Sequence, residues 1–306
     1  MWGDDKSLIR VPRLRCDRCS REAIVHQRYS GLHLCGDHLQ RDLVARVKRT
    51  IRARGWIRTG DRIAVALSGG RSSGSLLHFL SAHFGMRRDL SLVAITVDEG
   101  AGPSCDRGRI GRLAEGMGIE WAGTSFAEEF GGTPEAWNEH LPTPCRDILL
   151  DYALTSLARE VGATTLALGT DLDDEARNVL LSVLRGEAAR LMRSPRPGDG
   201  RIPLIRPFLR IPAQEVGLYA LLNVPPDGQA LCLHARDLQE SEVQRILDEY
   251  TNRHPAAMFS LVNLGEALRE RSVPGPGETL PCKGCRERFA TTCPARGSLD
   301  RVMGHV

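Results

Sequence analysis

The fold is decided by "ALSGGRSSG", residues 66–74, where an apolar run gives way to glycines, an arginine and serines. The run before it, "RIAVAL" (62–67), has the length of a buried strand, and "SLLHFL" (75–80) after it has helical spacing. A strand, a glycine-rich turn and a helix in this order are typical of a phosphate-binding loop, because backbone N–H groups and the helix N-terminus then face the anion. The turn lacks the closing Gly-Lys of the Walker pattern, and a tight turn that holds no ligand is the alternative.

The rest of the chain repeats this alternation of short apolar runs and helical patterns. Further strands are predicted at 91–97 and 164–169. The predicted helices are 41–56, 73–84, 106–117, 145–161, 175–186 and 241–253. Because strands and helices alternate, the sequence predicts an α/β fold built on a doubly wound parallel sheet.

Cysteines are paired near the N-terminus. The chain has nine cysteines in 306 residues, and an odd number without an export signal argues against a disulfide framework. Cys16 and Cys19 are separated by two residues, and so are Cys35 and His38. Two tight turns with this spacing converge on one tetrahedral ion, so the four residues are predicted to bind Zn²⁺.

A second group of cysteines lies near the C-terminus. Cys282 and Cys285 form a pair and Cys293 opens another, but Arg296 stands where its partner is expected. Either His305 or another residue supplies the fourth zinc ligand, or the site is degraded. The chain is therefore predicted to have an N-terminal zinc-binding module at 1–40, an α/β domain with the phosphate-binding turn at 41–272, and a C-terminal zinc-knuckle module at 273–306.

Charge and hydropathy exclude some classes of protein. No apolar run approaches the ~20 residues of a membrane helix, and the N-terminus is too acidic for a secretory signal, so we expect a cytoplasmic protein without a membrane partner. The net charge is only +3, but arginines gather at 46–58 and 185–210. These two stretches either bind nucleic-acid phosphates or form ordinary solvated surfaces.

The loop at 68–73 resembles the pyrophosphate loop of the ATP pyrophosphatase (PP-loop) superfamily, commonly Ser-Gly-Gly-x-Asp-Ser. Later segments narrow the resemblance: "VDEG" (97–100), "GTDLDDEARNVLLSVLRGE" (169–187), "LIRPF" (204–208) and the segment around Cys232. Together with the cysteine pairs at both ends, the chain resembles the tRNA 2-thiouridine synthetases of the TtuA/TtcA group.

The resemblance implies roles for particular residues. The cysteines Cys145 and Cys232 would face each other in the catalytic cleft, where they bind an iron–sulfur cluster or carry the sulfur. Asp173, a further catalytic candidate, and Asp174 would lie beside ATP, for Mg²⁺ or for proton transfer. The predicted ATP-binding residues are Ser68, Gly69, Gly70, Arg71, Ser72, Ser73, Asp98, Gly169 and Asp174.

The chain also departs from the family pattern. It has Arg71-Ser72 where relatives have Lys-Asp, and Thr170 where they have His. Only Cys145 stands in place of a Cys-x-x-Cys-Gly segment, so a third ligand for a [4Fe-4S] cluster is missing from its usual place. Cys105 is either that ligand or a plain loop thiol, and whether a cluster is bound stays open.

The implied activity is an ATP-dependent tRNA sulfurtransferase. The uridine C2 oxygen is adenylated and then replaced by sulfur, which splits a difficult substitution into two easier steps. The implied partners are tRNA and a sulfur-donor protein, either a ubiquitin-like sulfur carrier or a persulfide donor, and a homodimer is left open. The alternatives are the thiolation of a small nucleobase-like molecule, a non-catalytic tRNA-binding relative, and a zinc-dependent nucleic-acid-binding module.

Overall fold

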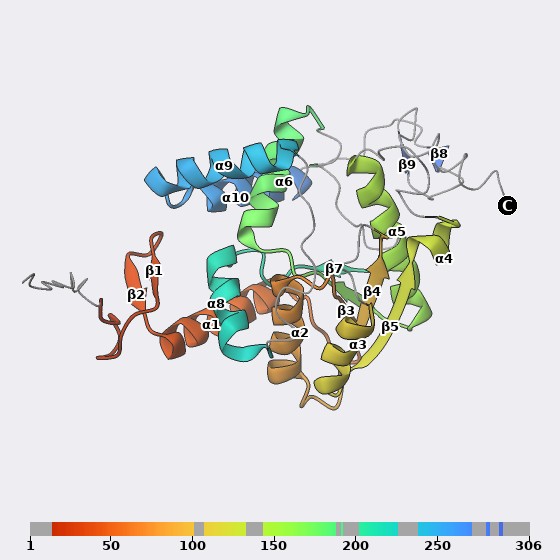
Figure 1. Ribbon diagram of the computed structural model, residues 1–306, viewed down its shortest axis with the longest axis horizontal. Coiled ribbons are helices and arrows are strands. Elements are labelled where there is room, and N and C mark those ends of the chain that lie inside the picture. Colours follow the sequence, from red (N-terminus) through yellow and green to blue (C-terminus); the bar gives the residue numbers. More distant parts are fainter. Residues whose placement is uncertain are drawn as a thin grey trace, which may run out of the picture.

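The structure is a computed structural model, and the residues that it describes are 14–100, 107–132, 143–187, 191, 202–225, 238–270, 280–281 and 288–289. Its centre is a five-stranded sheet with the strand order β5-β4-β3-β6-β7, in which every neighbouring pair is parallel (Figure 1). The strands are β3 (Arg62–Ala66), β4 (Ser91–Asp98), β5 (Glu120–Ser125), β6 (Thr165–Ala167) and β7 (Leu204–Ile205). The predicted parallel α/β fold is confirmed.

The centre of the sheet is buried on both faces, which is why β3 and β4 are apolar runs without alternation. Ile63 and Val65 of β3 point into one hydrophobic cluster, and Ala64 between them points into the other. The first cluster is completed by α1 (Gly36–Arg54), α2 (Arg71–Phe84), α3 (Arg107–Gly116) and α8 (Ala213–Asn223). The second is completed by α4 (Phe126–Phe130) and α5 (Thr143–Glu160).

Three helices form a further cluster of their own. They are α6 (Leu172–Leu184), α9 (Leu238–Arg253) and α10 (Ala257–Glu270). Buried apolar residues such as Ala176, Val243 and Val262 join them. Figure 1 shows α9 and α10 lying side by side, with α6 running from the sheet toward them.

The N-terminal module is a small hairpin followed by a long helix. Strand β1 (Val25–Gln27) pairs antiparallel with β2 (Leu32–Leu34), and α1 begins at Gly36, earlier than the predicted start at residue 41. Val25, Leu34 and Leu39 pack against the cysteines in a small cluster of buried residues. In the C-terminal region, β8 (Leu280–Pro281) pairs antiparallel with β9 (Arg288–Phe289). The predicted division into three domains stays a prediction.

The other predicted helices are confirmed as α2, α3, α5, α6 and α9, with small shifts at their ends. Several elements were not predicted: β5, β7, α4, α8 and α10. Strand β5 has only one buried residue, Thr124, and lies at the sheet edge, so it lacks the apolar run that marks β3 and β4. None of the described helices combines the length and apolar character needed to cross a membrane.

Candidate nucleotide site and metal centre

The strand order reverses between β3 and β6. The chain passes from β3 through α2 to β4 on one side, whereas β6 pairs with the other side of β3. In open α/β sheets, ligands bind in the crevice outside the carboxyl ends of the strands at such a switch point. The loop after β3, which includes 68–70, and the segment after β6, which includes 168–171, both lie at this position.

Serine hydroxyls within the loop after β3 fix its shape by hydrogen bonds. Gly69 adopts a φ of 75°, which a residue with a side chain rarely does. The Gly70 backbone N–H donates to the Ser68 hydroxyl at 3.4 Å, and the Ser73 hydroxyl donates to the Gly70 carbonyl at 2.9 Å. The loop therefore has a defined shape before any ligand arrives.

Helix α2 begins without a side-chain cap. Its N-cap residue is Gly70, and within the described residues no group accepts a hydrogen bond from the backbone N–H of 71, 72 or 73. By contrast, Ser125 caps α4 and Asp171 caps α6. Unpaired N–H groups at the positive end of a helix dipole are suited to a phosphate.

The segment after β6 lies directly against the loop. A Cβ added to Gly169 would be 2.8 Å from the Ser73 backbone N and Cα and from the Ser72 carbonyl carbon. Only glycine allows two backbones to approach so closely. Gly169 is thereby placed in the packing of the predicted ATP loop.

Asp171 is a site residue that the sequence analysis missed. One carboxylate oxygen accepts the Asp174 backbone N–H at 3.0 Å, and the other accepts the Ser72 hydroxyl at 3.0 Å. Its side chain is buried, and this burial, followed by the nearby charges of Asp174 and Asp173, raises the pKa of Asp171 to about 7. An aspartate just before a helical apolar pattern is a helix-cap signal, so its role at α6 was readable from the sequence.

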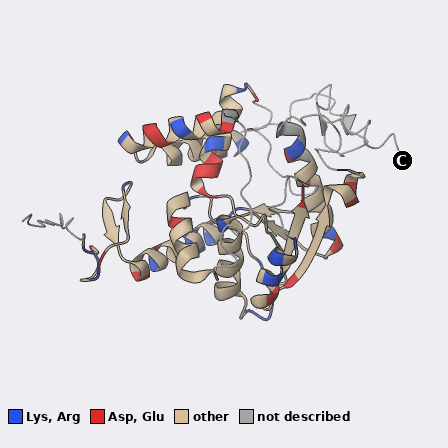
Figure 2. Cartoon of the chain, viewed as in Figure 1, with Lys and Arg blue, Asp and Glu red and all other residues tan. Residues whose placement is uncertain are grey.

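The two predicted acidic residues make other contacts. Asp173 accepts the Ala213 backbone N–H at 2.7 Å and so joins α6 to α8, and burial raises its pKa. Asp174 pairs with Arg177 at 2.5 Å. Figure 2 shows the acidic start of α6 as a red band at its sheet end. The roles of Asp173 and Asp174 toward Mg²⁺ stay predictions.

The remaining ATP-binding candidates lie around the same edge. Asp98 ends β4 and accepts the Gly100 backbone N–H at 2.9 Å. Arg71 is exposed at the start of α2, and its guanidinium reaches α8, where its Nη1 is 3.8 Å from the position of a Cβ on Gly217.

The predicted catalytic cysteines are only partly placed. Cys145 lies on the first turn of α5, and Cys232 lies outside the described residues. The neighbour of Cys145, Arg146, pairs with the buried Glu99, which follows β4. This ion pair joins the first turn of α5 to the carboxyl edge of the sheet. Cys105, Cys282, Cys285, Cys293 and His305 also lie outside the described residues.

The four predicted N-terminal metal ligands come together. Their ligand atoms all lie within 4.8 Å of one another. His38 Nδ1 is 3.4 Å from Cys16 Sγ and 3.3 Å from Cys35 Sγ, and the Cys19 and Cys35 sulfurs are 3.7 Å apart. A tetrahedral zinc with Zn–S of about 2.3 Å and Zn–N of about 2.0 Å has S–N edges of about 3.5 Å and S–S edges of about 3.8 Å. The donor set and its spacing fit zinc.

Local structure prepares these ligands. Cys35 is the N-cap residue of α1, and His38 follows in the first turn of that helix. Burial raises the pKa of the Cys16 thiol, but backbone N–H groups at Cys35 and Arg18 lower it to about 6. This favours the thiolate that metal binding requires.

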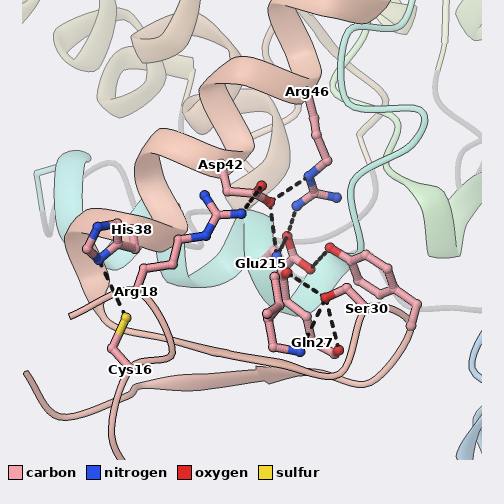
Figure 3. Close-up of polar contacts among 10 residues, drawn as sticks. Cys16, Arg18, Gln27, Ser30, His38, Asp42, Arg46 and Glu215 are labelled. Atoms are coloured by element: carbon pink, nitrogen blue, oxygen red, sulfur yellow. Dashed lines mark hydrogen bonds and ion pairs between the residues drawn. The ribbon is translucent and has the colours of Figure 1, made fainter. Parts of the chain in front are cut away.

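A buried polar cluster attaches this module to the α/β domain (Figure 3). Glu215 of α8 accepts the Tyr29 hydroxyl at 2.7 Å and the Gln27 amide at 3.2 Å, and it pairs with Arg46 of α1. Asp42 accepts from the same amide at 3.1 Å and from Arg46 at 2.9 Å. The hairpin, α1 and α8 are thus joined by a network of hydrogen bonds around the buried Glu215.

Some arginines of α1 and of the second predicted stretch pair with carboxylates, and other arginines of α1 do not among the described residues. Arg46 and Arg54 of α1 pair with Glu215 and Glu266, and Arg206 and Arg210 of the second predicted stretch pair with Glu175 and Glu266. These four arginines are thus tied to carboxylates. On the exposed face of α1, three arginines have no carboxylate partner among the described residues: Arg41, Arg49 and Arg52.

Comparison with known proteins gives matches along the chain. Residues 39–223, more than half of it, match the family described as the PP-loop domain, and residues 15–40 match the N-terminal LIM domain of the 2-thiouridine synthetase TtuA. The tRNA 2-thiolation protein NcsA of Haloferax volcanii is 29% identical, with 90% of this chain and 95% of the relative covered. Cytoplasmic tRNA 2-thiolation protein 1 of Bos taurus is 30% identical, with 95% and 88% covered.

A solved structure shares the fold. The U34-tRNA thiolase NcsA from Methanococcus maripaludis, determined with its [4Fe-4S] cluster, superimposes with a TM-score of 0.75 at 24% identity. The match covers 89% of this chain and 94% of that one.

Proposed function

The chain belongs to the PP-loop family and, within it, to the tRNA 2-thiolation proteins, and on that premise we propose that it is an ATP-dependent tRNA sulfurtransferase. The observation that carries this proposal is the uncapped start of α2. Its free backbone N–H groups lie at the switch point of the sheet, on a loop shaped by Gly69 and held close by Gly169.

The chemistry follows from this arrangement. ATP binds with its phosphates on the loop, and the uridine C2 oxygen attacks the α-phosphate, which releases pyrophosphate and leaves an adenylated base. Sulfur then attacks C2 and AMP departs, so one difficult substitution becomes two easier ones. The free N–H groups of 71, 72 and 73 hold the negative charge of the phosphates. Asp173 and Asp174 remain the candidates for Mg²⁺ binding or proton transfer.

The proposed sulfur chemistry uses Cys145 and Cys232. Cys145 is on the helix that the Arg146–Glu99 pair joins to the carboxyl edge of the sheet, the edge at which the loop lies. The related M. maripaludis structure contains a [4Fe-4S] cluster. We infer that Cys145 and Cys232 either carry sulfur as a persulfide or bind such a cluster, which would supply the sulfide. In the persulfide route, the outer sulfur on one cysteine bonds to C2, the thiolate of the other breaks the S–S bond, and the resulting disulfide is reduced by an external thiol. The donor is a sulfur carrier or persulfide protein.

The metal ions have separate roles. Zn²⁺ at Cys16, Cys19, Cys35 and His38 is structural, because all four positions of the tetrahedron are taken by protein ligands. A second zinc is proposed at Cys282, Cys285 and Cys293.

The proposed partner surface is the exposed face of α1. Arg41, Arg49 and Arg52 can bind RNA phosphates because no described carboxylate neutralises them. They support a tRNA substrate over a small nucleobase-like molecule, which has no backbone to contact them.

The sharpest test is Gly70→Val. Gly70 has φ −80° and ψ 160°, which valine tolerates, and a Cβ there meets only the Ser68 hydroxyl, at 3.4 Å. The variant should therefore fold and lose ATP binding and ATP-dependent sulfur transfer to tRNA, because the new side chain occupies the space above the free N–H groups. Calorimetry with ATP and Mg²⁺ and an anaerobic thiolation assay measure the two effects.

The matched control is Gly116→Val. Gly116 is exposed at the end of α3, with nothing within 4 Å of its Cβ position. It should keep both activities. A wild-type chain that does not bind ATP, or a Gly70→Val variant that binds it normally, would refute the proposed function. ATP binding with sulfur transfer only to small molecules would replace tRNA as the substrate.

A further inference from the structure

A single hydrogen bond joins the ATP loop to the segment after β6. The Ser72 hydroxyl donates to Asp171 at 3.0 Å, across 99 residues of sequence. We propose that this Ser72–Asp171 contact sets the geometry of the ATP loop, and that Asp171 is a positioning residue for ATP, an assignment that rests on the proposed function.

Asp171 is well fixed for this role. Its side chain is 3% exposed, and its second oxygen caps α6 through the Asp174 backbone N–H at 3.0 Å. With both oxygens held, the carboxyl group cannot rotate away from the loop. It therefore aligns the start of α2 with the start of α6, so that both helix N-termini meet at the switch point of the sheet.

The hydroxyl groups of the loop show which atoms are left for phosphate. The Ser73 hydroxyl hydrogen is used on the Gly70 carbonyl, and the Ser72 hydroxyl hydrogen is used on Asp171. Ser68 accepts from the Gly70 N–H and donates its own hydrogen to the Ser73 hydroxyl, both at 3.4 Å. The hydrogens of all three hydroxyl groups are thus used within the protein, so phosphate is bound by backbone N–H groups, and Ser72 orients the peptide that carries one of them.

The contact places a single carboxyl group at this junction. It belongs to Asp171, and the side chain that faces it is the Ser72 hydroxyl. Carboxylates at both positions would lie within about 3 Å and could not both ionise without strong repulsion. Adding a second carboxyl group by Ser72→Asp should therefore weaken ATP binding, and a simultaneous Asp171→Asn should restore it.

The repair has a specific geometry. In the double variant Ser72→Asp/Asp171→Asn, the carbonyl oxygen of the new amide keeps the cap on α6. The NH₂ group of the same amide donates to the carboxylate introduced at position 72, so the contact returns with donor and acceptor exchanged. A role in general stability would not predict this recovery, because the double variant changes two polar side chains at once, one of them buried.

The experiment measures ATP affinity by calorimetry and thermal unfolding for the full chain and its variants. Ser72→Ala should weaken ATP binding about tenfold, since the binding-competent loop becomes a minor conformer. Ser72→Asp should weaken it further, and the double variant should return to within about threefold of wild type. Ser72→Ala binding ATP as tightly as wild type, or a double variant as weak as Ser72→Asp, would overturn the proposal.

A matched control exists at the amino ends of the same two strands. The Thr164 hydroxyl donates to Asp61 at 2.9 Å, joining the segments before the same two strands, β6 and β3. Thr164→Ala should leave ATP affinity unchanged; an equal loss there would reject a specific role for Asp171. A wild-type chain without ATP affinity overturns the proposed function as well, whereas normal wild-type binding with an unaffected Ser72→Ala rejects only the Ser72–Asp171 contact.

Discussion

Replacing Gly169 with alanine tests whether ATP binding requires the segment after β6 to pack closely against the ATP loop. A Cβ there would lie 2.8 Å from backbone atoms of Ser72 and Ser73. Carbon atoms in good contact are about 3.5 to 4.0 Å apart, so the loop or the strand end must move by roughly 0.7 Å or more. Gly169 does not have a positive φ, so alanine adds no backbone strain and the effect is purely steric.

Overpacking of this kind costs about 1–3 kcal/mol of stability. The displacement also moves the N–H groups that bind phosphate, so ATP affinity should fall by at least about tenfold. Calorimetry and thermal unfolding on the same preparation separate the two effects. Gly265→Ala is the control, because its Cβ would meet a Val179 methyl group at 2.7 Å in the helical cluster rather than the loop. It should lose stability and keep ATP affinity. Normal ATP affinity in Gly169→Ala would refute the reasoning.

The other sites lead to three further expectations. Cys16→Ser should remove about one zinc per chain by metal analysis, and unchanged zinc would reject the N-terminal site. Arg49→Ala with Arg52→Ala should weaken tRNA binding in filter assays and flatten its salt dependence by roughly one unit per lost phosphate contact; an unchanged slope would place tRNA elsewhere. Glu215→Gln should cost about 1.5–3 kcal/mol in unfolding experiments, since one amide oxygen cannot replace the buried carboxylate that accepts from Tyr29, Gln27 and Arg46, although Arg46 keeps its pair with Asp42. Glu120→Gln, which breaks an exposed ion pair, should cost under about 1 kcal/mol, and equal losses would contradict the assigned role of the buried cluster.

Secondary-structure elements could be predicted from the sequence where a short segment alone carries the pattern. The runs at 62–67 and 91–97 are buried on both faces, so apolar composition alone marks them as strands. Strand β5 has a partly exposed edge and β7 has two residues, and neither leaves such a signal. The metal ligands were readable for the same reason, because tight turns fix their spacing.

The candidate nucleotide site contains a residue that local sequence signals do not place there. The glycine loop was predicted from its own residues, but Asp171 was not, because its contact with Ser72 is created by the pairing of β3 with β6. A motif shows which residue types a site needs. It does not show that a carboxyl group missing from one position is supplied by a residue on another loop.

Arginine placement leads to the same conclusion at the surface. A net charge of +3 suggests no special affinity for RNA, and the stretch 46–58 suggests a uniformly basic helix. The structure divides that helix, because Arg46 and Arg54 pair with glutamates far away in sequence, while Arg49 and Arg52 stay exposed. Pairing with glutamates neutralises some of the arginines, and the arginines of α1 that have no described carboxylate partner lie on its exposed face. RNA affinity in this chain should therefore depend on a few arginines, and total charge is a poor guide to it.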